Sequence, residues 1–279
     1  MRFTKMEGLG NDYVYVDARH ETIGNPSGLA VLISDRHFGV GADGLILILP
    51  SEAADARMEI YNADGSRAEM CGNGIRCVAK YVYEHGIARK EQLAVETDSG
   101  MKHLQLFTAG DIVESVRVDM GPPELERSRI PMKGPSGRVV GEPLEILDRT
   151  FRITALSMGN PHCVTFIDDV DGFEVAGYGP AVASHPSFPE GVNAEFAEVT
   201  DRRHVKMRVW ERGSGETLAC GTGACATCVA AVLNDLTERC VTLDLPGGEL
   251  KVEWSEKDDA VTLTGPAREV FTGEWPDSG

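Results

Sequence analysis

One short motif occurs twice in the chain, and this repeat constrains the fold more than any other feature. In each copy a cysteine precedes Gly-x-Gly, and an apolar stretch that predicts a helix follows. The cysteines lie 149 residues apart, a spacing far too long for one unit of a solenoid. The two copies are Met70-Cys71-Gly72-Asn73-Gly74-Ile75-Arg76-Cys77 and Ala219-Cys220-Gly221-Thr222-Gly223-Ala224-Cys225.

The same offset of 149 residues aligns other parts of the chain. It places Gly10-Asn11 on Gly159-Asn160 and Tyr13 on His162. It also places Met58, Ile60 and Tyr61 on Met207, Val209 and Trp210. We therefore predict a duplicated domain in this chain of 279 residues, a length that favours two domains. If the two halves face each other, they bring two equivalent thiols to one site.

Each cysteine precedes a predicted helix, over residues 75–84 in the first copy and 224–234 in the second. In the first helix, apolar residues from Ile75 to Val82 recur at the spacing of one buried face. In the second, Thr227 is the single polar residue between 224 and 233, which predicts a helix buried on all sides.

This position gives the cysteines a specific chemistry. A thiol at a helix N-terminus lies beside unpaired backbone N–H groups and the positive end of the helix dipole. That environment is expected to lower the pKa of the thiol below its usual value of about 8.5 and to favour the thiolate. The neighbouring glycines leave backbone amides free to approach an anion closely. Each copy therefore predicts a reactive thiol beside a carboxylate-binding turn.

The rest of the chain predicts many strands and few helices. Strand patterns cover residues 3–6, 13–16, 45–49, 57–62, 93–96, 101–107, 112–120, 151–156, 163–167, 193–199, 204–210, 241–245, 250–254 and 260–264. Residues 131–141 predict a loop, and residues 172–189 predict a mixture of helix and loop. Without regular βαβ alternation, this pattern indicates an α+β fold. Gly121-Pro122-Pro123 marks the expected boundary, between an N-terminal lobe of residues 1–120 and a C-terminal lobe of residues 121–264.

Composition excludes several classes of partner. The formal net charge of −17 argues against binding to nucleic acid or to an anionic membrane. The longest clear apolar run, residues 45–49, is too short to span a bilayer, and no signal-peptide pattern is apparent. The seven cysteines indicate reduced thiols rather than a disulfide framework, and we therefore expect a cytoplasmic protein.

Metal binding and redox chemistry are alternative roles for the cysteines. Structural zinc sites favour paired C-x2-4-C turns, whereas Cys77, Cys225 and Cys228 fall inside apolar helices, where cysteine packs as a small hydrophobic residue. No exposed C-x-x-C opens a helix, as a thioredoxin-like site would require. Cys163 and Cys240, both in predicted strands, are expected to pack. We therefore expect no metal site.

These motifs resemble those of the diaminopimelate epimerases, and the resemblance runs over nearly the whole chain. It rests on Gly8-Leu9-Gly10-Asn11-Asp12, on Tyr61-Asn62-Ala63-Asp64-Gly65-Ser66, on Glu69 to Cys77 and on Trp210 to Gly223. The resemblance implies two similar lobes, each a mostly antiparallel sheet wrapped around a central helix. It also implies an active site in the cleft between the lobes and a tail, residues 265–279, that returns to the first lobe.

The resemblance further implies an isomerase that interconverts LL- and meso-diaminopimelate without a cofactor, and a homodimer. Cys71 and Cys220 match the catalytic pair, one acting as thiolate base and the other as thiol acid. His162 and Glu211 match residues that tune the thiols. The small-molecule amino-acid substrate would be bound by Asn11, Asn62, Gly72, Asn73, Asn160, Asn193, Glu211, Arg212, Gly221 and Thr222.

Two departures from the family pattern concern the fit of the substrate. Gly44 stands where many relatives have a substrate-contacting glutamine, and the loop over residues 188–193 lacks a common arginine. One alternative is a thiol-based racemase of proline, hydroxyproline or another amino acid. Proline-type relatives, however, have histidine where Asn73 stands. Another alternative is a binding protein without catalytic activity, which the presence of both cysteines, Glu211 and His162 disfavours.

Overall fold

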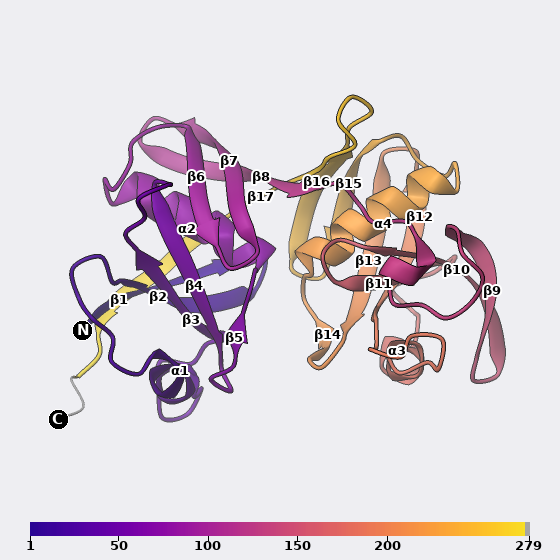
Figure 1. Cartoon of the computed structure of the whole chain (residues 1–279), viewed down its shortest axis with the longest axis horizontal. Coiled ribbons are helices and arrows are strands. Elements are labelled where there is room, and N and C mark those ends of the chain that lie inside the picture. Colours follow the sequence, from indigo (N-terminus) through magenta and orange to yellow (C-terminus); the bar gives the residue numbers. More distant parts are fainter. Residues whose placement is uncertain (277–279) are drawn as a thin grey trace. The chain divides into compact units, whose positions relative to one another are not determined.

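The computed structural model describes residues 1–276, and these residues divide into two compact units. The first unit comprises Met1–Val118 together with the segment that begins at Thr264, and the second comprises Asp119–Leu263. Figure 1 colours the first unit from indigo to purple, with its returning segment in yellow, and the second from magenta through orange to yellow-orange. Residues 277–279, the end of the predicted tail, lie outside the described residues.

The first unit is a mixed sheet in which most neighbouring strands are antiparallel. β2–β3 and β4–β6 are parallel, and the short β5 pairs with β4. The strands follow the order β18 (Arg268–Glu274), β1 (Arg2–Gly8), β2 (Asn11–Asp17), β3 (Gly44–Leu49), β4 (Ala56–Asn62), β6 (Gln92–Thr97), β7 (Gly100–Ala109) and β8 (Ile112–Gly121), with β5 at Arg67–Ala68.

Two helices cover this sheet. α2 (Gly72–Glu84) is buried from Gly72 to Val82 and contacts β1, β2, β4, β7 and β18, so the sheet wraps around it (Figure 1). α1 (Pro26–Ser34) packs its buried Ala30 and Ile33 on the other face, against residues of β2 and β3. Because successive side chains of a strand point to opposite faces, a strand between two helices is apolar throughout, as β3 is.

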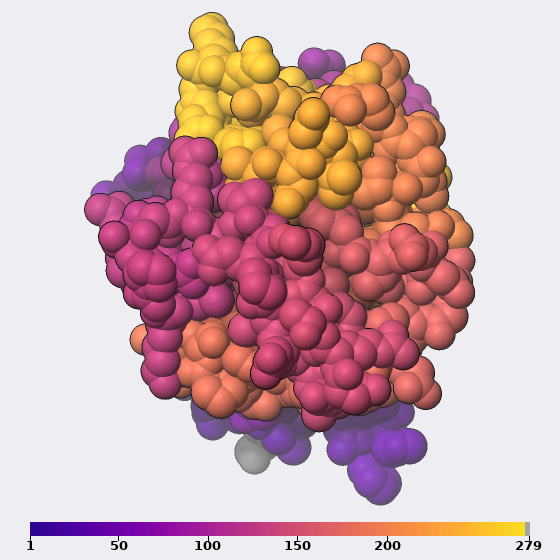
Figure 2. All heavy atoms as spheres, turned by 90° about the vertical axis from the view of Figure 1, so that its right-hand side faces the viewer, coloured from indigo at the N-terminus to yellow at the C-terminus, as the bar shows by residue number. Residues whose placement is uncertain are grey.

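The second unit repeats this plan. Its sheet pairs β11–β12 and β13–β15 in parallel and its other strands antiparallel, with β14 (Gly215–Thr217) on β13. The strands follow the order β9 (Val139–Ile146), β10 (Arg149–Ser157), β11 (Pro161–Phe166), β12 (Asn193–Asp201), β13 (His204–Glu211), β15 (Cys240–Leu245) and β16 (Gly248–Trp254), and β17 (Val261–Gly265) comes next in the chain. Figure 2 shows one face of this unit, where the yellow-orange segment around β16 reaches the surface.

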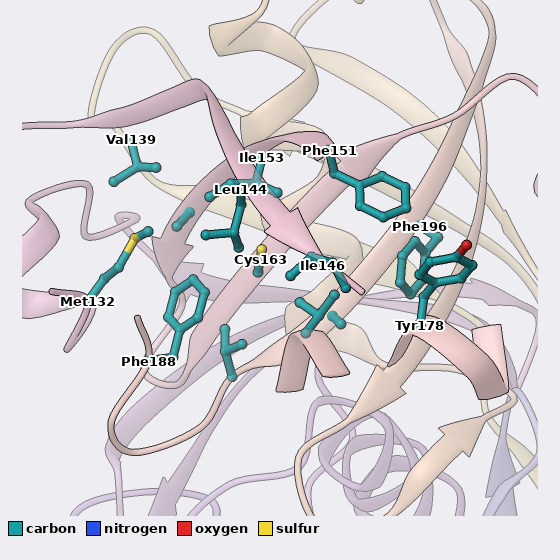
Figure 3. Close-up of a cluster of buried hydrophobic side chains, with 14 of the residues drawn as sticks. Met132, Val139, Leu144, Ile146, Phe151, Ile153, Cys163, Tyr178, Phe188 and Phe196 are labelled. Carbon is teal, nitrogen blue, oxygen red and sulfur yellow. The ribbon is translucent and has the colours of Figure 1, made fainter. Parts of the chain in front are cut away.

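The helices of the second unit occupy the same places as those of the first. α4 (Gly221–Leu233) contacts β10 to β13, β15 and β16 and is buried over most of its length, as the sequence predicted. α3 (Val175–Ala183) covers the other face, where its Tyr178 contacts Phe151 of β10 and belongs to the same apolar cluster as Phe196 of β12 (Figure 3). A short 3-10 helix, η1 (Arg127–Arg129), precedes β9.

Strand register confirms the two similar lobes of the predicted α+β fold. Tyr13 pairs with Gly44 in the first unit, and His162 pairs with Asn193 in the second. His162 and Asn193 each lie 149 residues after their counterparts, the same offset that separates the two cysteines. The first residues of α1 and α3 are separated by this same offset, and so are the first residues of α2 and α4. The connection from α4 to β15 is slightly shorter than that from α2 to β6. β15 therefore begins just before the residue that corresponds to the start of β6.

Several elements differ from the sequence-based prediction. The region 131–141, predicted as a loop, runs into β9 at Val139, and the tail contains β18, which pairs with β1. Residues 26–34, for which no helix was predicted, form α1. α2 and α4 begin at Gly72 and Gly221, because each cysteine is itself the helix cap. Within residues 1–276, no helix is long and apolar enough to cross a bilayer.

Candidate active site

Cys71 is the N-cap residue of α2 in the first unit. Its backbone is extended, with φ of −140°, and its Sγ accepts the N–H of Gly74 at 3.3 Å. Position 74 is tightly packed, since a Cβ there would lie 2.7 Å from Cδ1 of Ile46, which would have to shift. The first turn of α2 therefore packs closely against β3, and the thiol of Cys71 lies at the N-terminal end of the helix.

The thiol of Cys71 faces the amide of Asn11. Its Sγ donates to Oδ1 of Asn11 at 3.3 Å, while Nδ2 of Asn11 donates to Oδ2 of Asp43 at 2.7 Å. Arg36 in turn donates to Asp43 at 2.8 Å. Because Asp43 accepts from Nδ2, the amide oxygen of Asn11 is directed at the thiol. Burial, together with the charges of Cys71 and Asp43, raises the pKa of Tyr13 above its usual value, so this phenol stays protonated.

The other predicted residues of the first unit surround the start of α2. Gly72 and Asn73 are buried in its first turn, where backbone N–H groups are not used within the helix. Asn62, at the end of β4, donates from Nδ2 to Oγ of Ser66 at 3.0 Å. At Gly44 a Cβ would lie 2.2 Å from the carbonyl oxygen of Tyr61, so this backbone leaves no room for a side chain.

Cys220 is the N-cap residue of α4 in the second unit, in the same conformation as Cys71. Its φ is −121°, and its Sγ accepts the N–H of Gly223 at 3.4 Å. Oγ1 of Thr222 lies 3.5 Å from the same sulfur. A Cβ at Gly223 would lie 2.8 Å from Oε1 of Glu195, so glycine allows a buried carboxylate to approach the start of this helix.

The predicted lowering of the thiol pKa is wrong for Cys220. Burial raises its pKa well above the usual value, and the carboxylates of Glu211 and Glu195 raise it further. The hydroxyl of Thr222 and the N–H of Gly223 act in the opposite direction, but these effects are smaller. Loss of hydration therefore outweighs the helix cap, and Cys220 rests as a thiol.

Glu211, at the end of β13, lies beside this thiol. Its Oε1 accepts the hydroxyl of Thr217 at 2.5 Å. Burial raises the pKa of Glu211, and hydrogen bonds from Thr217 and Cys220 offset part of that rise. A carboxyl group held this way is suited to exchanging a proton with the thiol.

His162 is fully buried on β11, between two oxygen atoms. Its Nδ1 lies 2.6 Å from Oε1 of Glu195, and its Nε2 lies 3.0 Å from Oδ1 of Asn160. Glu195 is not among the site residues predicted from the sequence. The signal that could have found it is a single acidic residue within the otherwise apolar run from Ala194 to Ala197.

Arg212 follows β13 and is held by the loop that departs from the family pattern. Its backbone N–H donates to Oδ1 of Asn193, and its Nη1 donates to the carbonyl oxygen of Glu190, both at 2.8 Å. Gly191 has φ of +73°, and a Cβ there would lie 2.9 Å from Cδ of Arg212. The loop thus uses a glycine to let the arginine side chain lie across it.

The structure therefore groups the predicted residues within each unit. In the first, Asn11 and Cys71 are in contact, with Asn62, Gly72 and Asn73 on the elements around them. In the second, Glu211 and Thr222 contact Cys220, Asn160 contacts His162, and Asn193 contacts Arg212. Gly221 begins α4.

A model of the diaminopimelate epimerase family matches residues 3–126 and 154–270. The chain belongs to this family. The resemblance inferred from its motifs is thereby confirmed.

Full-length relatives support the same assignment. The diaminopimelate epimerase of Pelotomaculum thermopropionicum is 56% identical over 279 residues, with 99% of each chain covered. That of Acetivibrio thermocellus is 54% identical with 98% of each chain covered. That of Methanococcus maripaludis is 50% identical, covering 98% of this chain and 99% of the relative.

Solved structures at low identity share the fold alone. A PhzF-family phenazine biosynthesis protein from Bacillus anthracis superposes with a TM-score of 0.73 at 18% identity, covering 99% of each chain. A probable proline racemase from Agrobacterium radiobacter K84 gives a TM-score of 0.67 at 15% identity, covering 99% of this chain and 93% of the other. The family's two-lobe α+β architecture is thus common to proteins with different names.

Proposed function

We propose that this chain is an isomerase that interconverts LL- and meso-diaminopimelate, in lysine and peptidoglycan-precursor biosynthesis. The observation that carries the proposal is the paired cysteine caps, Cys71 on α2 and Cys220 on α4, in a member of this family. The names of relatives at 50–56% identity over nearly their full length support the same substrate.

Inversion of an amino-acid α-carbon requires that a proton leave one face and that another arrive at the opposite face. In the proposed reaction, the thiolate of one cysteine forms an S–H bond as the C–H bond breaks. The thiol of the other cysteine gives its proton to the carbon and becomes the thiolate. This mechanism requires Cys71 and Cys220 to reach opposite faces of the same carbon, and it needs no pyridoxal phosphate or metal.

The α-carboxylate would be bound by the amides that open the two central helices, at Gly72-Asn73 and Gly221-Thr222. These N–H groups and the helix dipoles stabilise the charge that develops as the α-carbon loses its proton. In the direction in which Cys220 donates, this cysteine starts from its resting thiol form, since its pKa is raised. In the other direction, Glu211 would take the proton of Cys220, with which it shares a hydrogen bond.

The distal amino-acid group of the substrate would be recognised by Arg212 with Asn11, Asn62, Asn160 and Asn193. A guanidinium binds a carboxylate through two parallel hydrogen bonds, which a single ammonium cannot reproduce. Arg212 is already oriented by the carbonyl of Glu190 and by Asn193. We further propose that the protein acts as a cytoplasmic homodimer, which size-exclusion chromatography with light scattering would test for assembly.

The test is a direct assay of purified protein with LL-diaminopimelate, followed by chiral separation. Meso-diaminopimelate should accumulate until equilibrium, and the same mixture should form from the meso isomer. L-Proline and trans-4-hydroxy-L-proline serve as comparison substrates. Turnover of either in preference to diaminopimelate would overturn the proposed substrate and favour the racemase alternative.

A further inference from the structure

We propose that Glu195 is a positioning residue of the reaction, which accepts the Nδ1 proton of His162 and thereby directs Nε2 of that ring toward Asn160. The expected effect of Glu195 on turnover rests on the proposed function. The expected protonation and orientation of the His162 ring do not depend on the identity of the substrate.

The contact is short and fully enclosed. Oε1 of Glu195 lies 2.6 Å from Nδ1 of His162, and both side chains have no exposed surface. The two residues lie on the parallel neighbours β11 and β12, where His162 pairs with Asn193. Glu195 is two residues farther along β12 and therefore points to the same face as Asn193.

A buried carboxylate is costly unless nearby groups compensate for its lost hydration, by several kcal/mol for an unpaired ion. Within residues 1–276, Oε2 of Glu195 has no hydrogen-bond partner, so the contact from His162 to Oε1 provides that compensation. A carboxylate without a proton can only accept a hydrogen bond. The proton between the two groups therefore belongs on Nδ1.

The first unit provides an internal comparison. The positions equivalent to His162 and Glu195 are occupied by Tyr13 and Ile46, in the same strand register. Ile46 and Glu195 also occupy equivalent positions in space. Ile46 approaches Gly74 at the start of α2, and Glu195 approaches the equivalent Gly223 at the start of α4. Where the histidine is replaced by a phenol, which has no tautomer to select, the carboxylate is replaced by an alkyl group. This joint replacement links the function of Glu195 to the ring it contacts.

The ring is surrounded by groups that take part in the proposed chemistry. Oδ1 of Asn160, a predicted substrate ligand, lies 3.0 Å from Nε2. An amide oxygen can only accept a hydrogen bond, so in this contact Nε2 is the donor. Among the titratable groups, Glu195 on β12 contacts the ring, and Glu211 on β13 interacts with it electrostatically. Glu195 also acts on Cys220 at the start of α4 and on Cys163, the residue after His162 on β11. Rotation of the ring would therefore misplace its contact with Asn160 and change the electrostatic field at Glu211.

The experiment compares Glu195→Gln with Glu198→Gln, a matched substitution on the same strand, where Oε2 of Glu198 accepts the N–H of Val170. We expect Glu195→Gln to lower kcat roughly 10- to 100-fold, by analogy with the loss of a hydrogen-bond partner from a metal-ligating histidine. Glu198→Gln should leave kcat within about twofold. Glu195→Gln should have little further effect in a His162→Gln background, because Glu195 acts through the ring. Equal losses in both backgrounds would overturn the proposal.

Nitrogen-15 NMR of the histidine rings provides a readout that a purely structural role would not change, and it needs no substrate. In the unaltered protein Nδ1 of His162 should carry a proton, and in Glu195→Gln its signal should move or divide between tautomers. A proton confined to Nε2 in the unaltered protein would overturn the proposal even if Glu195→Gln fails to fold. Absence of epimerase activity, with the expected tautomer, would instead count against the proposed function alone.

Discussion

Cys71 and Cys220 cap the central helices of their units with the same geometry. Each accepts the backbone N–H three residues ahead, at 3.3 Å from Gly74 and 3.4 Å from Gly223. Their surroundings nevertheless differ. Cys71 donates to the neutral amide of Asn11, whereas Cys220 lies beside the carboxyl groups of Glu211 and Glu195. The duplicated frame thus holds two similar thiols in two different electrostatic environments.

Removal of either thiol should abolish epimerisation. We expect Cys71→Ala and Cys220→Ala each to lower kcat by roughly a thousandfold or more, and the double variant to lose little beyond that, because the two act as a unit. Cys240→Ala, at the start of β15, is the control and should keep its activity. Chiral separation of the product measures the rate. Substantial turnover by either single variant would contradict the two-thiol mechanism.

The source of the new proton distinguishes two bases from one. In deuterated solvent, a two-thiol reaction should place solvent deuterium in the product from the first turnover, because the donating thiol exchanges with water between turnovers. Recovered substrate should stay largely unlabelled at early times, in both directions. Mass spectrometry of the separated isomers measures this. Product that keeps the substrate's own hydrogen at the inverted centre would show that one base serves both faces.

Arg212→Lys should weaken substrate binding more than it slows proton transfer. Lysine cannot reproduce the planar fork of the guanidinium, so we expect KM to rise about tenfold or more, with a smaller change in kcat. Arg203→Lys, which alters an exposed pair with Glu238, is the matched control. Steady-state kinetics with LL- and meso-diaminopimelate measure both constants. An unchanged KM would place the distal carboxylate elsewhere.

The raised pKa of Glu211 predicts a pH dependence of stability. Because the folded-state pKa exceeds the unfolded value of about 4.3, the protonated carboxyl stabilises the fold fully below that value. This contribution is lost as the pH rises through the folded-state pKa. Glu211→Gln cannot titrate, so its free energy of unfolding should improve relative to the unaltered protein as the pH rises. Urea unfolding of both proteins between about pH 4 and pH 8 measures the difference. A constant difference would show that the pKa of Glu211 is not raised.

The loop around Gly191 shows how a local departure from the family pattern can be accommodated. Its positive φ and its closeness to Arg212 explain why a glycine stands there. The sequence marked this position as unusual, but it did not indicate that the Arg212 side chain would lie across it. That contact joins two separate segments of the chain and exists only once β13 and the loop are in place.

Local patterns and an internal repeat could be recognised in the sequence alone. The repeated cysteine motif predicted two similar lobes, and its Gly-x-Gly turns predicted helices that begin beside Cys71 and Cys220. The helices follow from short-range rules of capping and periodicity, which act within one or two turns. The apolar composition of α4 likewise predicted its burial.

Tertiary structure alone decided the electrostatics of the second thiol and the partner of His162. Glu195 and Cys220 belong to separate elements, and only the pairing of β12 with its neighbours places the carboxylate of Glu195 beside His162 and Gly223. A helix N-terminus by itself favours a thiolate, but burial removes the water that would stabilise that charge. The motif could therefore identify Cys220 as a reactive residue, whereas its raised pKa depends on desolvation and on charges brought near it by the fold.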